Sequence, residues 1–417
     1  MENNNDKKIL NVPALRFPEF TGEWKRIKVS DLLDFYSTNS LSWEQLEYEP
    51  NEPYNLHYGL IHVGLPTLID MTKDKLPSIK DGNVPKKYEL CKEGDIAFAD
   101  ASEDTNEVAK VVEFYDLDGK KVLCGLHTIH GRNSNGLTAK GFLGYCFSST
   151  VFHNQIRRIA QGTKIYSIST RNFSEIFVGL PSRNEQQKIA TLLRLIDERI
   201  ATQNKIIEDL KKLKSAISKH LFARKDLLET TICLSNIATL KNGYAFQSGK
   251  YNALGKWKIL TITNVPGERY INDEDCNCII NLPNDIQDHQ VLKEGDILIS
   301  LTGNVGRVSL CKNGDYLLNQ RVGLLQLAKN VNREFIYQIL SSQRFENSMT
   351  ACGQGAAQMN IGKGDVESFV LPYSSNGNNI LWVAKILHSY DERIINELRR
   401  LTLLTMQKQY LLTQMFI

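Results

Sequence analysis

The sequence has no long apolar run, few prolines and no strong excess of one charge. None of its segments approaches the length of a membrane span, about 18 consecutive apolar residues, and the polar start Met1–Lys8 lacks the apolar core of a signal peptide. Only 11 prolines and a charged fraction of 23% exclude a collagen-like or mostly disordered chain. A net charge of +3 is too small to indicate nucleic-acid binding by itself. We therefore expect a soluble, cytoplasmic protein, and at about 150 residues per domain its 417 residues predict two to four domains.

Catalytic motifs are also missing. The sequence has no GxxxxGK(S/T) phosphate-binding loop, no GxSxG nucleophile turn, no HExxH zinc helix and no Asn/Asp-Pro-Pro-aromatic tetrad of an adenine methyltransferase. The eight cysteines are scattered, without a CxxC pair or a histidine at zinc-finger spacing. We therefore expect reduced thiols in cores and turns, no metal site and no catalytic residues.

The chain contains a tandem repeat of roughly 194 residues. The segment Lys92–Ile96 returns as Lys293–Ile297, and Ile196–Ile200 is matched by Tyr390–Ile394. The matches keep their order and their offset drifts by only a few residues, as insertions and deletions in loops would produce. We predict an α+β fold with two tandem α/β domains, each followed by a long helix.

Each copy has the same internal plan. Short β-branched and aromatic runs predict strands, and a single helix is expected at 139–160 in the first copy and at 333–350 in the second. The long helices are expected at about 184–222 and 378–415, because these segments contain no glycine or proline before their ends. The predicted boundaries are 1–183 for the first domain, 184–225 for the first long helix, 226–372 for the second domain and 373–417 for the second long helix.

The two long helices carry a heptad seam, which predicts a coiled coil. Lys214 and Gln203 interrupt the seam of the first helix, and Lys408 and Glu397 interrupt that of the second. A parallel pair would place Lys214 against Lys408, whereas an antiparallel pair can place Lys214 against Glu397 and Gln203 against Lys408. We therefore predict antiparallel pairing in which the numbers of facing residues sum to 611.

The basic residues are unevenly distributed. The stretch 119–174 contains eight lysines and arginines and no acidic residue. Such segregation is typical of a surface that faces a polyanion, although a solvated basic face is the alternative. In the second copy the turn Thr302–Arg307 and the segment Asn319–Arg321 hold donors of the kind that read base edges.

Together these features resemble the specificity subunit of type I restriction-modification systems, over nearly the whole chain. The amino-terminal segment, two target-recognition motifs and the start of the first long helix carry the resemblance: Val12–Trp24, Lys293–Ile297, Thr302–Gly306 and Glu185–Ala190. The resemblance implies a non-catalytic reader of a split DNA target, with one domain for each half and the helices as a spacer. It also implies that two methyltransferase subunits and the motor-nuclease subunits bind this chain. S-adenosylmethionine, ATP and magnesium are then expected on those partners, and no cofactor on this chain.

Polar loop residues beside the repeated motifs are the predicted DNA contacts. In the first copy they are Ser102, Glu103, His127, Arg132, Lys164 and Tyr166. In the second copy they are Thr302, Asn304, Arg307, Gln320, Arg321, Gln358, Asn360 and Lys363. Two other functions stay open: a coiled-coil scaffold that joins two protein-binding modules, and a nuclease or methyltransferase with unrecognised motifs.

Overall fold

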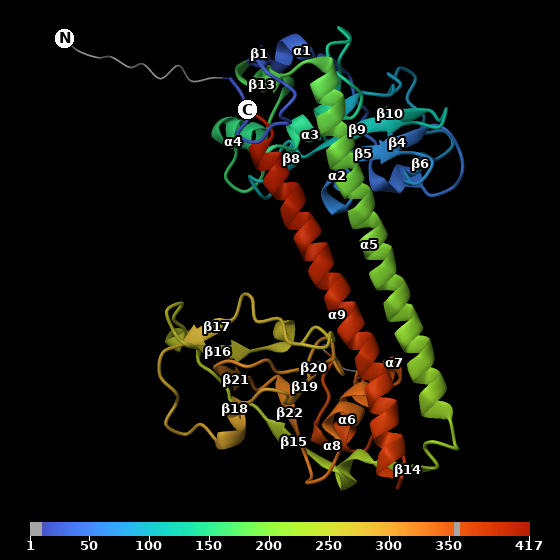
Figure 1. Ribbon diagram of the computed structural model, residues 1–417, viewed down its shortest axis with the longest axis vertical. Helices are drawn as coiled ribbons and strands as arrows, with labels where there is room; N and C mark the ends of the chain where they lie inside the picture. The colour runs from blue at the N-terminus through green and yellow to red at the C-terminus, as the bar shows by residue number, and fades with distance from the viewer. Residues whose placement is uncertain (1–10, 354–358) are drawn as a thin grey trace, which may run out of the picture. The chain divides into compact units, whose positions relative to one another are not determined.

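The computed structural model describes residues 11–353 and 359–417, and its contacts divide the chain into two compact units. The first unit holds residues 1–204 and 400–417, and the second unit holds residues 205–399. Two long helices, α5 (Arg183–Ala223) and α9 (Gly377–Gln414), contribute one part to each unit (Figure 1). The two units therefore meet within the long helices, at 204/205 and 399/400, whereas the predicted domain boundaries lie at the ends of those helices. The predicted boundaries stay a prediction. Among the described residues, no helix is both long enough and apolar enough to cross a membrane.

The first unit is built on two small sheets. Its strands are β1 (Lys25–Lys28), β2 (Asp34–Tyr36), β3 (Leu46–Glu47), β4 (Tyr54–Leu56), β5 (Leu68–Asp70), β6 (Ser78–Ile79), β7 (Ile96–Ala99), β8 (Ala101–Ser102), β9 (Val111–Asp116), β10 (Val122–Cys124), β11 (Thr128–Arg132), β12 (Tyr166–Ser167) and β13 (Phe177–Leu180). Its short helices are α1 (Val29–Leu32), α2 (Tyr58–Val63), α3 (Phe142–Phe147) and α4 (Thr150–Ile159). The larger sheet has the order β2-β11-β7-β9-β5, and the smaller one has the order β10-β4-β6-β3. Two further strand pairs, β1-β13 and β12-β8, lie outside these sheets.

Strand β7 separates two hydrophobic cores of the first unit. All its residues are buried, and successive side chains of a strand point to opposite faces, so Phe98 faces one core while Ala97 and Ala99 face the other. Residues of α3, α4 and the start of α5 share the core of Phe98, whose ring lies 5.1 Å from Phe147 and 4.8 Å from Phe173. This packing fixes the end of β7, where the candidate site begins.

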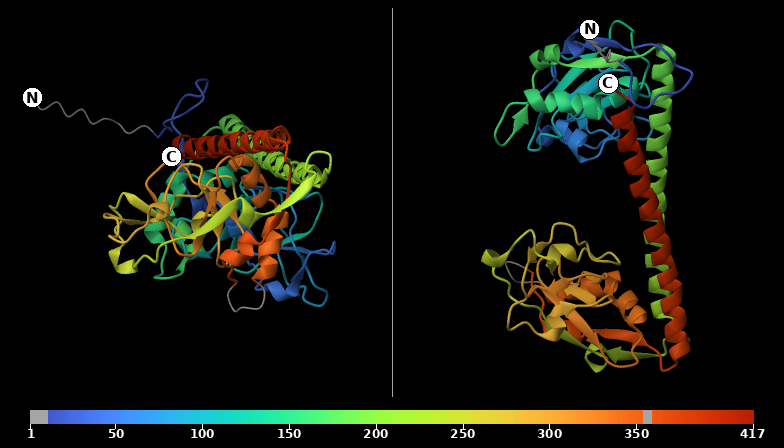
Figure 2. Two further views of the ribbon diagram at one scale, coloured as in Figure 1. Left: turned by 90° about the horizontal axis from the view of Figure 1, so that it is seen from below. Right: turned by 60° about the vertical axis from the view of Figure 1, so that its left-hand side comes forward.

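The second unit repeats this plan with two four-stranded sheets. Its strands and short helices are drawn in yellow-green to orange in Figure 2. Its strands are β14 (Thr230–Cys233), β15 (Ala238–Asn242), β16 (Trp257–Leu260), β17 (Asn277–Ile279), β18 (Val291–Leu292), β19 (Ile297–Ser300), β20 (Val308–Leu310), β21 (Tyr316–Leu318), β22 (Val322–Leu327) and β23 (Val370–Tyr373). Its short helices are α6 (Arg333–Leu340), α7 (Gln343–Cys352) and α8 (Lys363–Glu367). The sheets have the orders β15-β22-β19-β20 and β17-β16-β21-β18. Strand β19 is buried along its length, as β7 is in the first unit.

Each unit contains two short helices where the sequence predicts one. The segment 139–160 forms α3 and α4, and 333–350 forms α6 and most of α7. The breaks fall at a serine pair that occurs in both copies. In the first unit Ser149 is the N-cap of α4, and its hydroxyl accepts a hydrogen bond from the Phe152 amide. Because a serine N-cap satisfies an amide that the first helical turn leaves free, it favours a new helix start, and the prediction of one helix was wrong.

The two long helices pair as the heptad pattern predicts. Every predicted seam position of α5 and α9 is buried or half-buried. In the second unit the helices run antiparallel, because Lys214 Nζ lies 2.5 Å from Asp391 Oδ1 while Asn379 Nδ2 donates to the carbonyl of Leu227. The observed bounds of both helices are within one residue of the predicted ones.

The predicted register of this pair is wrong by six residues. Lys214 lies against Asp391, where the prediction places Glu397. In the first unit Lys408 Nζ lies 2.7 Å from Asp197 Oδ1, where the prediction places Gln203. Both observed pairs have numbers that sum to 605 rather than 611. The two aspartates occupy the same place in the repeat, and each also accepts a hydrogen bond from its own globular part, which a heptad pattern cannot reveal. Their other donors are Tyr145 Oη, on Asp197, and Arg269 and Gln338, on Asp391.

We expect a double-mutant cycle to detect the observed register. Lys408→Ala and Asp197→Ala should show a coupling free energy of about 1 kcal/mol, because both side chains are about one-fifth exposed and are only partly screened by water. The free energy of unfolding of the single and double variants measures it. Glu198→Ala is the matched control, since that exposed residue pairs with Arg194. Equal coupling of Lys408 to Glu198 and to Asp197 would contradict the register.

Candidate nucleic-acid interface

Three loops meet at the end of the central strand in each unit, through the same two backbone hydrogen bonds. In the first unit the Asp100 amide donates to the His127 carbonyl at 3.0 Å, and the Ile168 amide donates to the Asp100 carbonyl at 2.9 Å. In the second unit Leu301 takes the place of Asp100, with Arg321 and Ile361 as its partners. The Leu301 amide donates to the Arg321 carbonyl at 3.0 Å, and the Ile361 amide donates to the Leu301 carbonyl at 2.9 Å. We call this arrangement the three-loop junction.

Strand pairing extends the junction in the same register in both units. Strands β8 and β12 pair Ser102 with Tyr166, and Ala101 with Ser167. The second unit has the corresponding bridge between Thr302 and Asn360, and the Thr302 hydroxyl donates to Asn360 Oδ1 at 3.1 Å. The backbone of the junction is therefore shared, whereas the side chains that it presents differ.

Five predicted site residues of the first unit lie at its junction or next to it in sequence. His127 is exposed and has a positive φ of 54°, an uncommon backbone conformation for a residue other than glycine. Its Nδ1 lies 3.2 Å from Asp100 Oδ1. Ser102 and Tyr166 are paired across β8 and β12, and Glu103 follows as an exposed residue. Lys164 is also exposed, in the turn that precedes β12. This edge combines hydroxyl, imidazole, carboxylate and ammonium groups.

Arg132 was predicted to contact DNA, but its side chain has structural partners. Its guanidinium donates to Asp95 at 2.8 and 2.9 Å and to Glu89 at 2.6 Å, and it lies over the Tyr36 ring at 4.4 Å. Its hydrogen bond with Asp95 raises the pKa of Arg132. The side chain is only 11% exposed, so its donors serve the fold and we assign it a structural role.

The basic stretch 119–174 is less positive in space than in sequence. Acidic residues from the preceding part of the chain pair with several of its cations. Lys120 contacts Asp118 at 3.0 Å, and Lys140 contacts Glu93 at 2.7 Å. Arg132 is neutralised by Asp95 and Glu89 as described. Lys164 and Arg171 are exposed cations on either side of the junction residue Ile168 along the chain. Because several of its cations have acidic partners, the stretch 119–174 offers fewer candidate DNA contacts than its number of basic residues suggests.

The second unit gathers amide and guanidinium groups at its junction. Gln320 and Arg321 are exposed. The backbone N–H of Gln320 donates to the backbone carbonyl of Tyr244 at 3.0 Å, so its side chain is not used in this bond. Asn304 is exposed in the turn that follows Thr302. Lys363 begins α8 two residues beyond the junction, where its ammonium lies 3.7 Å from Glu367. Arg307 is 39% exposed, 3.8 Å from Glu346. Gln358, which was also predicted, lies outside the described residues.

A row of aromatic rings beside His127 was missed by the sequence analysis. Trp43 lies 4.5 Å from His57, His57 lies 4.7 Å from Tyr58, and Tyr58 lies 5.1 Å from His127, as distances between ring centroids. Burial and the neighbouring His127 lower the pKa of His57. Trp43 is 45% exposed, so this row offers stacking surface next to the junction. Trp43 lies far from the repeated motifs in sequence, and only the density of aromatic residues around 54–58 could have indicated the row.

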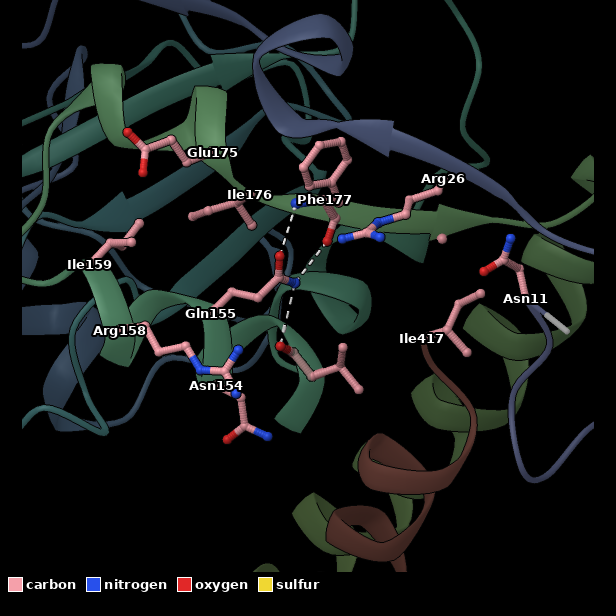
Figure 3. Close-up of a pocket in the computed structure, with 12 residues that line it drawn as sticks. Asn11, Arg26, Asn154, Gln155, Arg158, Ile159, Glu175, Ile176, Phe177 and Ile417 are labelled. Carbon is pink, nitrogen blue, oxygen red and sulfur yellow. Dashed lines mark hydrogen bonds between the residues drawn. The ribbon is translucent and has the colours of Figure 1, made fainter. Parts of the chain in front are cut away.

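A cavity of the first unit lies away from the junction, beside β1 and β13 (Figure 3). It has a volume of about 590 Å³. Gln155 lies in it with its amide group paired to the backbone of Phe177, at 2.8 and 3.0 Å. The described lining has two cations, Arg26 and Arg158, and one acidic side chain, Glu175. This cavity therefore offers no carboxylate pair for general acid–base catalysis.

Both halves of the chain match one family in sequence. Residues 75–212 and 229–404 match the family described as type I restriction modification DNA specificity domain. The MjaVIII specificity subunit of a type I restriction enzyme from Methanocaldococcus jannaschii is 28% identical over 46% of this chain and 49% of that protein. The match to this relative thus spans about half of its length. The EcoKI specificity subunit of Escherichia coli strain K12 is 24% identical over 64% of each chain.

Solved structures have the same fold. The S subunit of a type I restriction-modification system from M. genitalium covers 97% of this chain and 99% of its own, with a TM-score of 0.57 and 18% identity. A chain from a study of complex assembly and conformational transition of the type I R-M system covers 93% of this chain and 96% of its own, with a TM-score of 0.56 and 15% identity. At these identities the likeness concerns the fold alone.

Proposed function

Because the chain belongs to the family of type I restriction-modification DNA specificity proteins, we propose that it is the sequence-specific DNA-binding subunit of such a complex. Each unit reads one part of a split, asymmetric target. The observation that carries this proposal is the three-loop junction, which recurs in both units with different side chains. A shared backbone frame with different side chains suits two readers that recognise different bases.

The residues at each junction have the chemistry that base reading requires. Arginine binds guanine through two hydrogen bonds, and asparagine or glutamine does the same with adenine. The second unit offers Arg321, Gln320 and Asn360 for these contacts, and the first offers His127 and Tyr166. We propose that these side chains contact base edges in the major groove, while the loops that carry them lie along the sugar–phosphate backbone of the DNA.

The outer faces of the long helices are the proposed docking surface for the methyltransferase subunits. In the first unit α5 and α9 expose large apolar side chains there, namely Leu195, Leu403, Met406 and Tyr410. Leu403, Met406 and Tyr410 are three and four residues apart, so they lie on one face of α9, and an exposed apolar face marks an interaction site. The methyltransferase subunits bring S-adenosylmethionine, and the motor-nuclease subunits bring ATP and magnesium. This chain contributes recognition and no catalytic step.

Salt dependence of DNA binding tests the proposal. Contacts to phosphates release counterions, so the affinity of the purified full chain for duplex DNA should fall steeply as the salt concentration rises. The salt slope, which is the slope of log affinity against log salt concentration, should be about −0.9 for each phosphate contacted. Fluorescence anisotropy of a labelled duplex measures this slope. A chain that binds duplex DNA no better than an unrelated protein of similar net charge would contradict the proposal.

Lys164→Ala is expected to weaken binding to all DNA sequences alike. Lys164 is an exposed ammonium beside the first junction, a group that contacts phosphates as a point charge. Its loss should reduce the salt slope by about one, with sequence preference unchanged. The same titrations measure this effect. Lys73→Ala is the matched control, because Lys73 is exposed and pairs with Asp70 elsewhere in this unit. If both variants change the slope equally, Lys164 has no particular role.

A further inference from the structure

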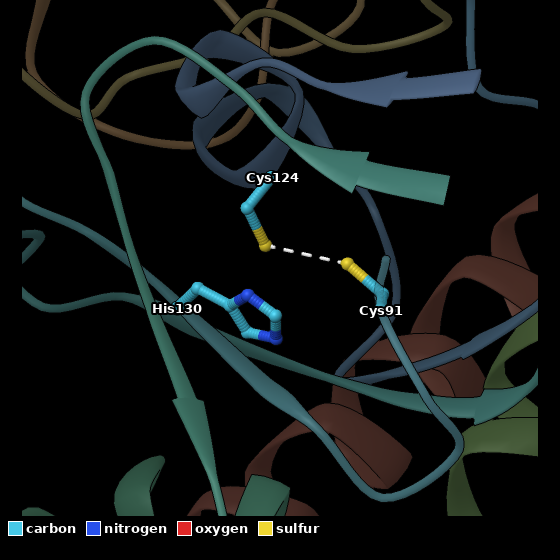
Figure 4. A group of neighbouring side chains, drawn as sticks. All are labelled: Cys91, Cys124 and His130. Atoms are coloured by element: carbon cyan, nitrogen blue, oxygen red, sulfur yellow. Dashed lines mark hydrogen bonds between the residues drawn. The ribbon is translucent and has the colours of Figure 1, made fainter. Parts of the chain in front are cut away.

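Two thiols and an imidazole meet in the interior of the first unit (Figure 4). Cys91 lies in the loop that leads to β7, Cys124 ends β10, and His130 lies in β11. The two sulfurs are 3.6 Å apart, and the sulfurs and a ring nitrogen of His130 all lie within 4.8 Å of one another. All three residues are buried, and His130 is fully enclosed. Cys124 and His130 lie on consecutive strands, and the sheets bring them to Cys91, which is 33 residues from Cys124 in sequence.

The hydrogen bonds of His130 leave one nitrogen available to the sulfurs. Its Nε2 lies 2.7 Å from Asp95 Oδ2, and Arg132 donates to the same carboxyl group. Since both oxygens of Asp95 accept hydrogen bonds from Arg132, this carboxyl group acts as an acceptor, and the hydrogen between it and His130 is on Nε2. Among the described residues His130 Nδ1 has no hydrogen-bond partner, and Figure 4 shows it on the side of the ring that faces Cys124.

The charges around the cluster select a divalent cation. Arg132 already contacts the carboxylates of Asp95 and Glu89, so it supplies no surplus positive charge to the cluster. Two ionised thiols would then leave two uncompensated negative charges, which a buried site does not tolerate without a partner. A dication neutralises them. Thiolate and imidazole ligands together are typical of zinc, and a histidine whose second nitrogen is held by a carboxylate is the usual arrangement at zinc sites.

We propose that Cys91 Sγ, Cys124 Sγ and His130 Nδ1 bind a zinc ion, with Asp95 as the positioning residue for His130. On binding, two S–H bonds break and two protons leave to solvent, while two zinc–sulfur bonds and one zinc–nitrogen bond form. No electron is transferred. Two of the ligands, Cys124 and His130, bracket the loop that carries His127. If the proposed function holds, the metal fixes this recognition loop at its base.

Metal content of the purified full chain tests the site directly. We expect the reduced chain, incubated with zinc and then freed of excess metal, to retain one zinc per chain in native mass spectrometry. Replacement by cobalt should give the intense thiolate-to-cobalt charge-transfer absorption of a cysteine-ligated ion. Retention of no zinc, or cobalt binding without that absorption, would overturn the proposal. Neither measurement involves DNA, so the outcome is independent of the proposed function.

Variants assign the ligands. Cys124→Ser should abolish retention of zinc, and Asp95→Asn should weaken zinc affinity about 10–100-fold, as the loss of a residue that orients a ligand does. Cys146→Ser is the matched control, because Cys146 is another buried cysteine of this unit and lies outside the cluster. Zinc retained equally by Cys124→Ser would contradict the site, and so would a Cys91–Cys124 disulfide that persists under the reducing conditions. If Cys124→Ser does not fold, the cobalt spectrum of the unmodified chain decides.

Discussion

Replacing Asp391 by alanine is expected to destabilise the second unit by about 3–5 kcal/mol, the usual result of breaking a buried ion pair by removing one partner. The Asp391 carboxylate accepts hydrogen bonds from Lys214 on α5, at 2.5 Å, and from Arg269 at 2.9 Å. Gln338, on α6, donates to the same carboxylate at 2.5 Å. The side chains of Asp391 and Arg269 are 7% and 8% exposed. The substitution therefore removes the carboxylate that Lys214 contacts and leaves the poorly hydrated Arg269 with Glu334 alone as its acidic partner among those described.

Hydrogen–deuterium exchange of the second unit measures this effect. Because the chain has two units, exchange within α6 reports the local loss of stability better than one global unfolding curve. Glu392→Ala is the matched control, since Glu392 is the exposed neighbour of Asp391 on the same helix. Protection of α6 that is equally reduced in both variants would show that the carboxylate of Asp391 does not connect the helices to the globular part.

Arg321→Ala is expected to weaken binding to the sequence that the unmodified chain prefers by about 1–3 kcal/mol, as the loss of a base-reading arginine does. The arginine side chain is exposed at the second junction. Its carbonyl holds the Leu301 loop, and alanine keeps that carbonyl. The loss of affinity should therefore come from the side chain and not from a disordered junction.

Titration of the preferred duplex measures this loss. Gln326→Ala is the matched control, because Gln326 is exposed on β22, the strand that follows Arg321. An unchanged affinity for Arg321→Ala, with the junction intact by hydrogen exchange, would remove Arg321 from the set of base contacts.

The sequence predicted the parts of the fold that depend on local pattern. The repeat and the bounds of the long helices could be read from the spacing of apolar residues and from the positions of glycine and proline. The register could not be predicted in this way. Asp197 and Asp391 are held in place by hydrogen bonds from Tyr145, Arg269 and other residues, which contact the helices only in the folded chain. The helix break before Ser149 depends on a capping hydrogen bond that competes with the apolar pattern.

The candidate site was predictable where it coincides with the repeat. The residues around Thr302 and Arg321 follow repeated motifs, and the structure brings them to one junction. Arg132 looked like a DNA contact because its acidic partners, Asp95 and Glu89, are about 40 residues away in sequence. In the cluster of Cys91, Cys124 and His130, Cys91 is 33 residues from Cys124, so the sequence shows no metal-site spacing. Whether a polar side chain can contact DNA depends on its partners in the folded chain. Those partners can be distant in sequence, so a linear motif does not show them.

Selection of bound sequences from a random duplex pool tests the central claim, that each unit reads its own part of a split target. The unmodified chain should select two separated groups of specified bases. Arg321→Ala should lose specificity in one group only, and His127→Ala in the other group only. If either substitution blurs both groups equally, or if a single contiguous group is selected, the two units do not act as separate readers.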